Sequence, residues 1–271
     1  MLTTAASLAL GVVEGLTEFL PVSSSGHLIL ARDLLGVNTE SGLAFDAVLQ
    51  LGSILAVFIY FRRKVWKLVL TAWRLVGKER KSVKPADRNL VVGLILGTIP
   101  ALILGLVLQK AMDSVFRNAF LVACALVTGS LLFWLAERFA KQTSNQPTVK
   151  QAWWIGVFQC LALIPGMSRS GSTISGGLLL GLTRESATRF GFLLSLPIIT
   201  GSGLLMLVKI LKAGAVDFSY SGLALGFLAS FLVGYACIAW LIGYLKKHSL
   251  MVFVWYRLAL AAVVFITLAW S

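Results

Sequence analysis

The sequence predicts an all-α polytopic membrane protein that forms one integral membrane domain over residues 1–271. The chain is 58% hydrophobic and only 13% charged, with a mean hydropathy of +0.88, whereas soluble domains are roughly half apolar and a quarter charged. Four segments hold no charged residue: 90–108, 119–136, 190–208 and 218–245. Runs of about 20 apolar residues match the length of a helix that crosses the hydrocarbon core of a bilayer.

We expect six apolar segments to cross the membrane completely. They lie at about 43–61, 90–109, 118–136, 188–208, 221–245 and 250–270. Two further apolar stretches, at about 5–34 and 151–182, are interrupted by small polar residues at 21–27 and 165–173. Irregular backbone at membrane depth is stable only where it is buried in protein or lines a polar cavity. The sequence therefore predicts two re-entrant helix–loop–helix hairpins, each entering and leaving the membrane on one side.

The two interrupted stretches match each other at a constant spacing of 145 residues. The matched pairs are Gly11 and Gly156, Glu14 and Gln159, Ser23 and Ser168, Ser25 and Ser170, and Gly26 and Gly171. Chance matching is the alternative, but an offset that also holds at polar positions favours duplication. We expect one repeat at about 1–136 and a second at about 150–271. Each would contain one hairpin and three spans, and this odd number of crossings would invert the second repeat, as in many transporters.

The net charge of +13 is concentrated in one part of the chain. Ten of the 24 Lys and Arg residues lie between Arg62 and Arg88, directly after an expected span. Basic residues clustered beside a span are typical of a cytoplasmic loop that faces an anionic leaflet. We therefore expect the lipid bilayer as the partner of this charge, and no nucleic acid. The first hairpin would then enter from the outer face, and a site at its tip would open to that face.

Two acidic residues lie inside the first apolar stretch. Glu14 and Glu18 are four residues apart, so a helix places both carboxylates on one face. An ionisable side chain at bilayer depth costs about 2.5–3.5 kcal/mol on insertion scales, and it usually marks a functional site. A structural ion pair with a distant arginine is the alternative.

The loop after these acids offers groups suited to phosphate chemistry. Its polar residues are Ser23, Ser24, Ser25, Gly26 and His27. Because Pro21 ends the helix, hydroxyl and backbone N–H groups of this loop can converge on an anion. His27 can act as a nucleophile or as an acid and base near neutral pH.

The second loop supplies a cation instead of acids. It contains Ser168, Arg169, Ser170, Ser172 and Thr173. A guanidinium binds phosphate oxygens bidentately, so Arg169 requires either a bound phosphate or a carboxylate, Glu14 or Glu18, from the other loop. The surrounding hydroxyls favour phosphate. Neither loop is complete alone, and we expect the two tips to form one shared site.

Two other charged residues lie in or near spans. Asp46 either lines the cavity or lies at the interface, and we expect Arg257 to extend its charge to the interface from the start of the last span. The sequence contains no zinc-ligand spacing, Walker loop or Rossmann glycine pattern.

Both loops carry long motifs that resemble a known family. Residues 11–27 read GVVEGLTEFLPVSSSGH, and residues 165–177 read PGMSRSGSTISGG. These segments resemble the two signatures of the bacterial undecaprenyl-diphosphatase family, which was named for bacitracin resistance. The resemblance implies a phosphatase of the bacterial cytoplasmic (inner) membrane. It would hydrolyse undecaprenyl diphosphate to undecaprenyl phosphate and inorganic phosphate, which recycles the lipid carrier of peptidoglycan synthesis in cell wall biogenesis.

The resemblance also implies roles for individual residues. It places the catalytic set at Glu14, Glu18, Ser24, His27 and Arg169. From the hydroxyls and the glycine of the two loops we expect the phosphate-binding set to be Ser23, Ser25, Gly26, Ser168, Ser170 and Thr173. A divalent cation, Mg²⁺ or Ca²⁺, would bind Glu14 and Glu18, although two carboxylates are a small ligand set. Glu18 would act as a base or hold His27, and the sequence leaves open whether Ser24 or His27 is the nucleophile.

Two alternative functions are considered. A transporter or flippase of a polyprenyl phosphate lipid would also contain inverted repeats. The type-2 phosphatidate phosphatase family has a motif similar to residues 24–27, but it needs a further histidine after its arginine. The only other histidine here is His248, so this second alternative is weak. The oligomeric state stays open, with a homodimer as one option.

Overall fold

A computed structural model describes residues 3–36, 39–77, 79–114, 118–213 and 219–270. The described chain is α-helical with two short 3₁₀ turns and contains no β-strand. The helices are α1 Thr4–Phe19, α2 Ser24–Leu35, α3 Thr39–Tyr60, α4 Arg62–Val76, α5 Pro85–Ser114, α6 Ala119–Phe139, α7 Val149–Gln159, α8 Arg169–Leu179, α9 Arg184–Ala213, α10 Tyr220–Leu245 and α11 Met251–Trp270; the 3₁₀ turns are η1 Arg80–Ser82 and η2 Cys160–Leu163. The prediction of an all-α fold is confirmed.

Among the described residues, five helices are long and apolar enough to cross a membrane. They are Pro85–Leu108, Ala119–Phe139, Arg184–Val208, Tyr220–Leu245 and Met251–Trp270, and they coincide with five of the six predicted spans. The sixth, predicted at 43–61, lies in α3, whose segment Phe45–Tyr60 passes the same test as a bent pair with Arg62–Val76, and these two segments meet at an angle of 84°. Two basic residues, Arg62 and Arg63, directly follow the bend, so the chain turns where the basic segment begins.

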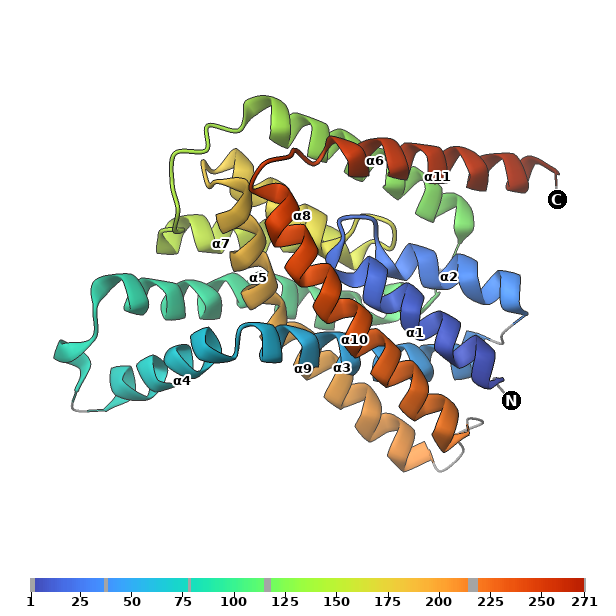
Figure 1. Ribbon diagram of the computed structural model, residues 1–271, viewed down its shortest axis with the longest axis horizontal. Coiled ribbons are helices and arrows are strands. Elements are labelled where there is room, and N and C mark those ends of the chain that lie inside the picture. Colours follow the sequence, from blue (N-terminus) through green and yellow to red (C-terminus); the bar gives the residue numbers. More distant parts are fainter. Residues whose placement is uncertain (1–2, 37–38, 78, 115–117, 214–218, 271) are drawn as a thin grey trace.

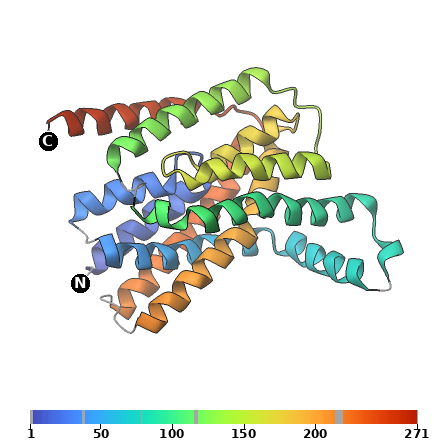
Figure 2. The ribbon, with the colours of Figure 1, turned by 180° about the vertical axis from the view of Figure 1, so that it is seen from behind.

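Helix α4 is amphipathic and projects from one end of the bundle beside the start of α5 (Figures 1 and 2). Its apolar face is exposed, with Trp66 and Trp73 at 66% and 80% of full exposure. Its basic face is joined to α5 by an ion pair of 2.7 Å between Lys67 Nζ and Asp87 Oδ1.

The chain reverses direction between α1 and α2 and again between α7 and α8 (Figure 1). Ser23 and Ser168 directly precede α2 and α8 as their N-cap residues, and they have positive φ angles of 78° and 71°. Each serine Oγ accepts a hydrogen bond from the backbone N–H three residues later, at 3.4 Å from Gly26 and 3.2 Å from Gly171. A serine rarely adopts this conformation. The two loops thus share one unusual backbone conformation at positions 145 residues apart.

Each hairpin packs on a long helix from the other half of the chain. Helix α1 packs on α10, and α7 packs on α5. A Cβ atom on Gly11 would lie 2.3 Å from the Gly226 oxygen, and one on Gly156 would lie 2.1 Å from the Gly97 oxygen. Small residues let membrane helices approach this closely. Gly11 and Gly156 are 145 residues apart, so the first helix of each hairpin uses a glycine at the same position for this contact.

Candidate active site

The tips of the two hairpins contact each other directly. The Gly166 N–H donates a hydrogen bond of 3.1 Å to Ser23 Oγ, and Ser170 Oγ donates one of 3.1 Å to the Leu20 carbonyl. In both ribbon views the loop that follows α1 lies beside the loop that precedes α8 (Figures 1 and 2). Residues that are far apart in sequence therefore form one polar cluster.

Glu18 lies at the centre of this cluster and joins the two loops. Its Oε2 accepts a hydrogen bond of 2.5 Å from Ser24 Oγ, and its Oε1 accepts one of 3.0 Å from Arg169 Nη2. Arg169 also donates from Nη1 to the Gly191 carbonyl at 3.4 Å, whereas its buried Nε has no partner. Of the two anionic partners considered for Arg169, the structure supplies a carboxylate. The Nε donor is left for a further acceptor.

Glu14 lies one turn before Glu18 and is fully buried. Both of its carboxylate oxygens lack a hydrogen-bond partner, and so do both amide atoms of Gln159, the equivalent residue in the second hairpin. A buried carboxylate without donors requires a proton or a cation.

These acids fit a divalent cation that binds together with phosphate. Within the described residues, no group of three or more His, Cys, Asp or Glu side chains could hold a metal ion. Mg²⁺, however, is commonly bound by one or two carboxylates plus substrate phosphates. The unpartnered oxygens of Glu14, assisted by Glu18, match that pattern.

His27 is held by backbone and by α11, and not by Glu18. Its Nδ1 lies 2.8 Å from the Ser23 carbonyl, and its Nε2 lies 2.7 Å from the Tyr256 hydroxyl. The two rings are stacked with centroids 5.7 Å apart. Glu18 makes its described hydrogen bonds to Ser24 and Arg169. The expectation that Glu18 holds His27 is therefore wrong, because the two ring nitrogens of His27 lie against the Ser23 carbonyl and the Tyr256 hydroxyl.

Several predicted phosphate-binding groups shape the loops instead of facing a free space. Ser23 and Ser168 cap α2 and α8, which also engages the N–H groups of Gly26 and Gly171. Thr173 Oγ1 donates to the carbonyls of Arg169 and Ser170. The remaining hydroxyls pair with the caps: Ser25 Oγ lies 3.3 Å from Ser23 Oγ, and Ser170 Oγ lies 3.1 Å from Ser168 Oγ. Of these hydroxyl groups, that of Ser25 lies on the exposed side.

Arg257 does not extend to the interface as predicted, because it points inward and is fully buried. Its Nη2 lies 3.2, 3.1 and 2.9 Å from the carbonyl oxygens of Ala125, Leu126 and Gly166. Its guanidinium carbon lies 4.7 Å from the centre of the Phe133 ring. Several carbonyl dipoles and an aromatic face offset part of the cost of burying the charge. The sequence could have indicated this inward orientation, because charged residues within membrane spans usually face the protein interior and belong to functional sites.

Asp46, for which the sequence left two positions open, is 13% exposed and forms an ion pair with Arg32 of α2. This pair joins α2 to α3 and supports the first hairpin from its far end. Asp46 therefore faces another helix of the protein.

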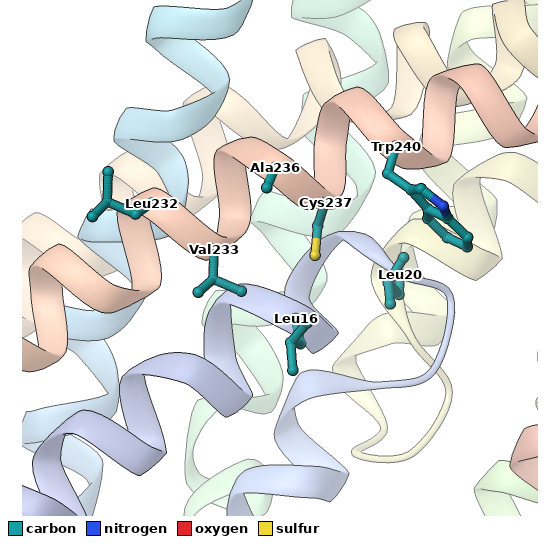
Figure 3. Close-up of a pocket in the computed structure, with 7 residues that line it drawn as sticks. All are labelled: Leu16, Leu20, Leu232, Val233, Ala236, Cys237 and Trp240. Carbon is teal, nitrogen blue, oxygen red and sulfur yellow. The ribbon is translucent and has the colours of Figure 1, made fainter.

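An open apolar groove of about 540 Å³ runs between α1 and α10 (Figure 3). It is lined by Leu16, Leu20, Leu232, Val233, Ala236, Cys237 and Trp240. Leu16 is two residues from both acids and so lies on the opposite face of α1. Leu20 begins the first loop, and its carbonyl accepts the bond from Ser170. One end of the groove therefore adjoins the polar cluster.

The chain is similar to known bacterial proteins over most of its length. The sequence model of a family described as bacitracin resistance protein BacA matches residues 7–263. Undecaprenyl-diphosphatase 1 of Corynebacterium jeikeium is 45% identical over 261 residues, covering 95% of this chain and 92% of that protein. Undecaprenyl-diphosphatase of Alteromonas mediterranea is 43% identical over 259 residues, covering 94% and 95%.

Proposed function

Because the chain belongs to the bacitracin resistance protein BacA family, we propose that it dephosphorylates undecaprenyl diphosphate. The products are undecaprenyl phosphate and inorganic phosphate. The observation that carries the proposal is the contact of Ser24 and Arg169, from two different hairpins, with the same carboxylate of Glu18. A hydroxyl, a base and a phosphate-binding cation within one cluster are the groups that phosphoryl transfer requires. A flippase requires no hydroxyl paired with a base.

Ser24 is the nucleophile in this proposal. Its Oγ attacks the terminal phosphorus while its proton passes to Glu18, the bond from that phosphorus to the bridging oxygen breaks, and undecaprenyl phosphate leaves. Water then attacks the phosphoserine and gives a proton to Nε2 of His27, which the Tyr256 hydroxyl releases. The bond from phosphorus to Ser24 Oγ breaks, Glu18 returns the first proton to Ser24, inorganic phosphate leaves, and His27 gives its proton to solvent. The support for Ser24 over His27 is the 2.5 Å contact of its hydroxyl with Glu18, a base that can take the proton, whereas the partners of His27 are a carbonyl and a hydroxyl.

Arg169 stabilises the charge on the transferred phosphoryl group through its planar guanidinium. Its unpartnered Nε provides a donor beyond the bond to Glu18. A divalent cation held by Glu14 and Glu18 would neutralise charge on the diphosphate. The prenyl chain would leave through the apolar groove, which adjoins the cluster at Leu20.

The protein lies in the bacterial inner membrane in this proposal, with the hairpins re-entrant and the repeats inverted. The basic, exposed face of α4 and its tryptophans suit the headgroup region of the cytoplasmic leaflet. Because α3 runs from the first hairpin toward α4, the hairpin enters from the opposite side. The active site then opens to the periplasmic face, where the spent carrier lipid becomes available.

The test uses purified protein in detergent with undecaprenyl diphosphate labelled in its terminal phosphate. We expect release of labelled phosphate, loss of release in Ser24→Ala, and no loss in Ser221→Ala, an exposed serine at the start of α10. Acid quenching should leave acid-stable label on Ser24, because phosphoserine survives acid whereas phosphohistidine does not. Absence of phosphate release would favour the flippase, and acid-labile label would favour His27.

A further inference from the structure

A closed circuit of hydrogen bonds connects α11 to both loops. Arg257 Nη2 donates to the Gly166 carbonyl at 2.9 Å, and the Gly166 N–H donates to Ser23 Oγ at 3.1 Å. The Ser23 carbonyl lies 2.8 Å from His27 Nδ1, and His27 Nε2 lies 2.7 Å from the Tyr256 hydroxyl. Tyr256 and Arg257 are neighbours in sequence. The circuit therefore begins and ends on α11 and passes through one residue of the second loop and two of the first hairpin.

The partners of His27 define its tautomer. A carbonyl oxygen only accepts hydrogen bonds, so Nδ1 carries the hydrogen that the Ser23 carbonyl accepts. In the neutral ring Nε2 is then an acceptor, and the Tyr256 hydroxyl donates to it. The parallel stacking of the two rings, 7° apart, also fixes the plane of the imidazole.

Packing alone does not explain the burial of Arg257, because burying a charged side chain costs free energy. It is fully buried, no carboxylate pairs with it in the part of the chain that the structure describes, and its Nη1 has no partner. Removing a charge from water costs several kcal/mol even after relaxation. Arg257 donates from Nε to the Ser130 hydroxyl and from Nη2 to two carbonyls of α6 and to the carbonyl of Gly166. The N–H of Gly166 in turn donates to Ser23 Oγ. Ser23 immediately precedes Ser24.

We propose that Tyr256 and Arg257 are positioning residues of the active site. Tyr256 holds His27 in the tautomer with hydrogen on Nδ1, and Arg257 holds the Gly166 peptide that fixes Ser23 and thereby Ser24. This inference rests on the proposed phosphatase function, but it assigns to α11 a part of the site that neither motif contains. Neither residue reacts with substrate.

The Tyr256→Phe variant tests the positioning role of Tyr256, because it keeps the stacked ring and removes only the hydroxyl. The chain has two histidines, so a His248→Gln background leaves His27 as the sole signal in ¹⁵N-histidine NMR. We expect the background protein to show hydrogen on Nδ1. Tyr256→Phe should shift the Nε2 signal, and its kcat should fall about 3- to 10-fold, the effect of one hydrogen bond, with little change in KM.

The matched control is Tyr235→Phe on α10. Tyr235 packs edge-to-face on Tyr60 and does not contact His27, so this variant should change neither the signal nor kcat. A Tyr256→Phe protein with the parent's Nε2 signal and kcat would overturn the role of Tyr256. If the parent itself releases no phosphate, the proposed function fails instead, while the NMR measurement still tests the contact.

The role of Arg257 is tested without replacing the arginine, because an Arg257→Lys protein that did not fold would give no result. A Cβ atom on Gly129 would lie 2.2 Å from Arg257 Nη2, so Gly129→Ala should displace the guanidinium from Gly166. We expect kcat to fall at least 3-fold in protein that still elutes as a folded species. Gly243→Ala, where a Cβ meets nothing within 4 Å, should keep kcat. Folded Gly129→Ala protein with unchanged kcat would refute the role of Arg257.

Discussion

Replacement of Arg169 by lysine separates the charge of this residue from its geometry. In the structure the guanidinium donates from Nη2 to Glu18 at 3.0 Å and from Nη1 to the Gly191 carbonyl at 3.4 Å, and Nε is left over. A lysine ammonium keeps the positive charge and can keep the contact with Glu18. Its three hydrogens radiate from one nitrogen, so it cannot also serve a phosphate through a planar fork.

The expected loss follows from the bonds that lysine cannot make. A hydrogen bond to a charged group contributes about 1.5–3 kcal/mol. If Arg169→Lys loses one such bond to the transferring phosphoryl group, kcat/KM should fall about 10- to 150-fold, because each 1.36 kcal/mol is a factor of ten. The ion pair with Glu18 is kept, so the melting temperature should change little.

Phosphate release from undecaprenyl diphosphate measures this loss. The matched control is Arg189→Lys, which changes an arginine of α9 that is 41% exposed and pairs with Glu185 one turn away. Such a surface pair contributes about 0.5 kcal/mol to stability at most and nothing to the site, so activity should stay within about twofold of wild type. Wild-type kcat/KM in Arg169→Lys would refute the bidentate role of Arg169.

Three further predictions concern topology, the buried acid and helix packing. Single cysteines at Lys81 and Asn118 should be labelled from the cytoplasmic and the outer side respectively, and labelling from one side would contradict the proposed topology. Glu14→Gln should raise the melting temperature, because a neutral amide is less costly to bury than an unpartnered carboxylate. The same variant should depend less on divalent cations for its activity. A lower melting temperature would contradict this reasoning. Gly156→Ala should destabilise the protein by about 1–3 kcal/mol in denaturant titration, because the added Cβ would lie 2.1 Å from a carbonyl oxygen of α5. The control variant Gly243→Ala should not destabilise the protein, because its Cβ meets nothing within 4 Å. Equal effects of the two substitutions would refute the close contact.

The sequence indicated that the acids of the first motif and the cation of the second would need partners, because each lies at a break in an apolar helix. For Arg169 it left open Glu14, Glu18 or a bound phosphate and favoured phosphate, and the structure pairs Arg169 with Glu18, 151 residues away. The length of the apolar runs likewise predicted five of the membrane-length helices. These predictions succeeded because burial of charge in a membrane leaves few alternatives.

The contributions of α11 could not be predicted in the same way. Hydropathy gives the length of a helix but not the direction in which each side chain points, so Arg257 was assigned to the interface although it turns inward. The contact between Tyr256 and His27 spans 229 residues, and no local pattern indicates it. The division of the hydroxyls into capping and free groups also depends on the positive φ angles of Ser23 and Ser168, which a serine-rich sequence does not predict.

The two loops share one backbone conformation but carry different chemistry at equivalent positions. Under the 145-residue shift Ser24, the nucleophile that we propose, corresponds to Arg169, since each directly follows a capping serine with positive φ. The two side chains meet on the two oxygens of Glu18, whose carboxylate only the first hairpin provides. An unusual serine conformation costs about 1–3 kcal/mol and persists where the surrounding structure requires it. Its presence in both loops indicates that this turn directs the next side chain toward the common centre, so one duplicated turn could supply the nucleophile from one half and the phosphate-binding cation from the other.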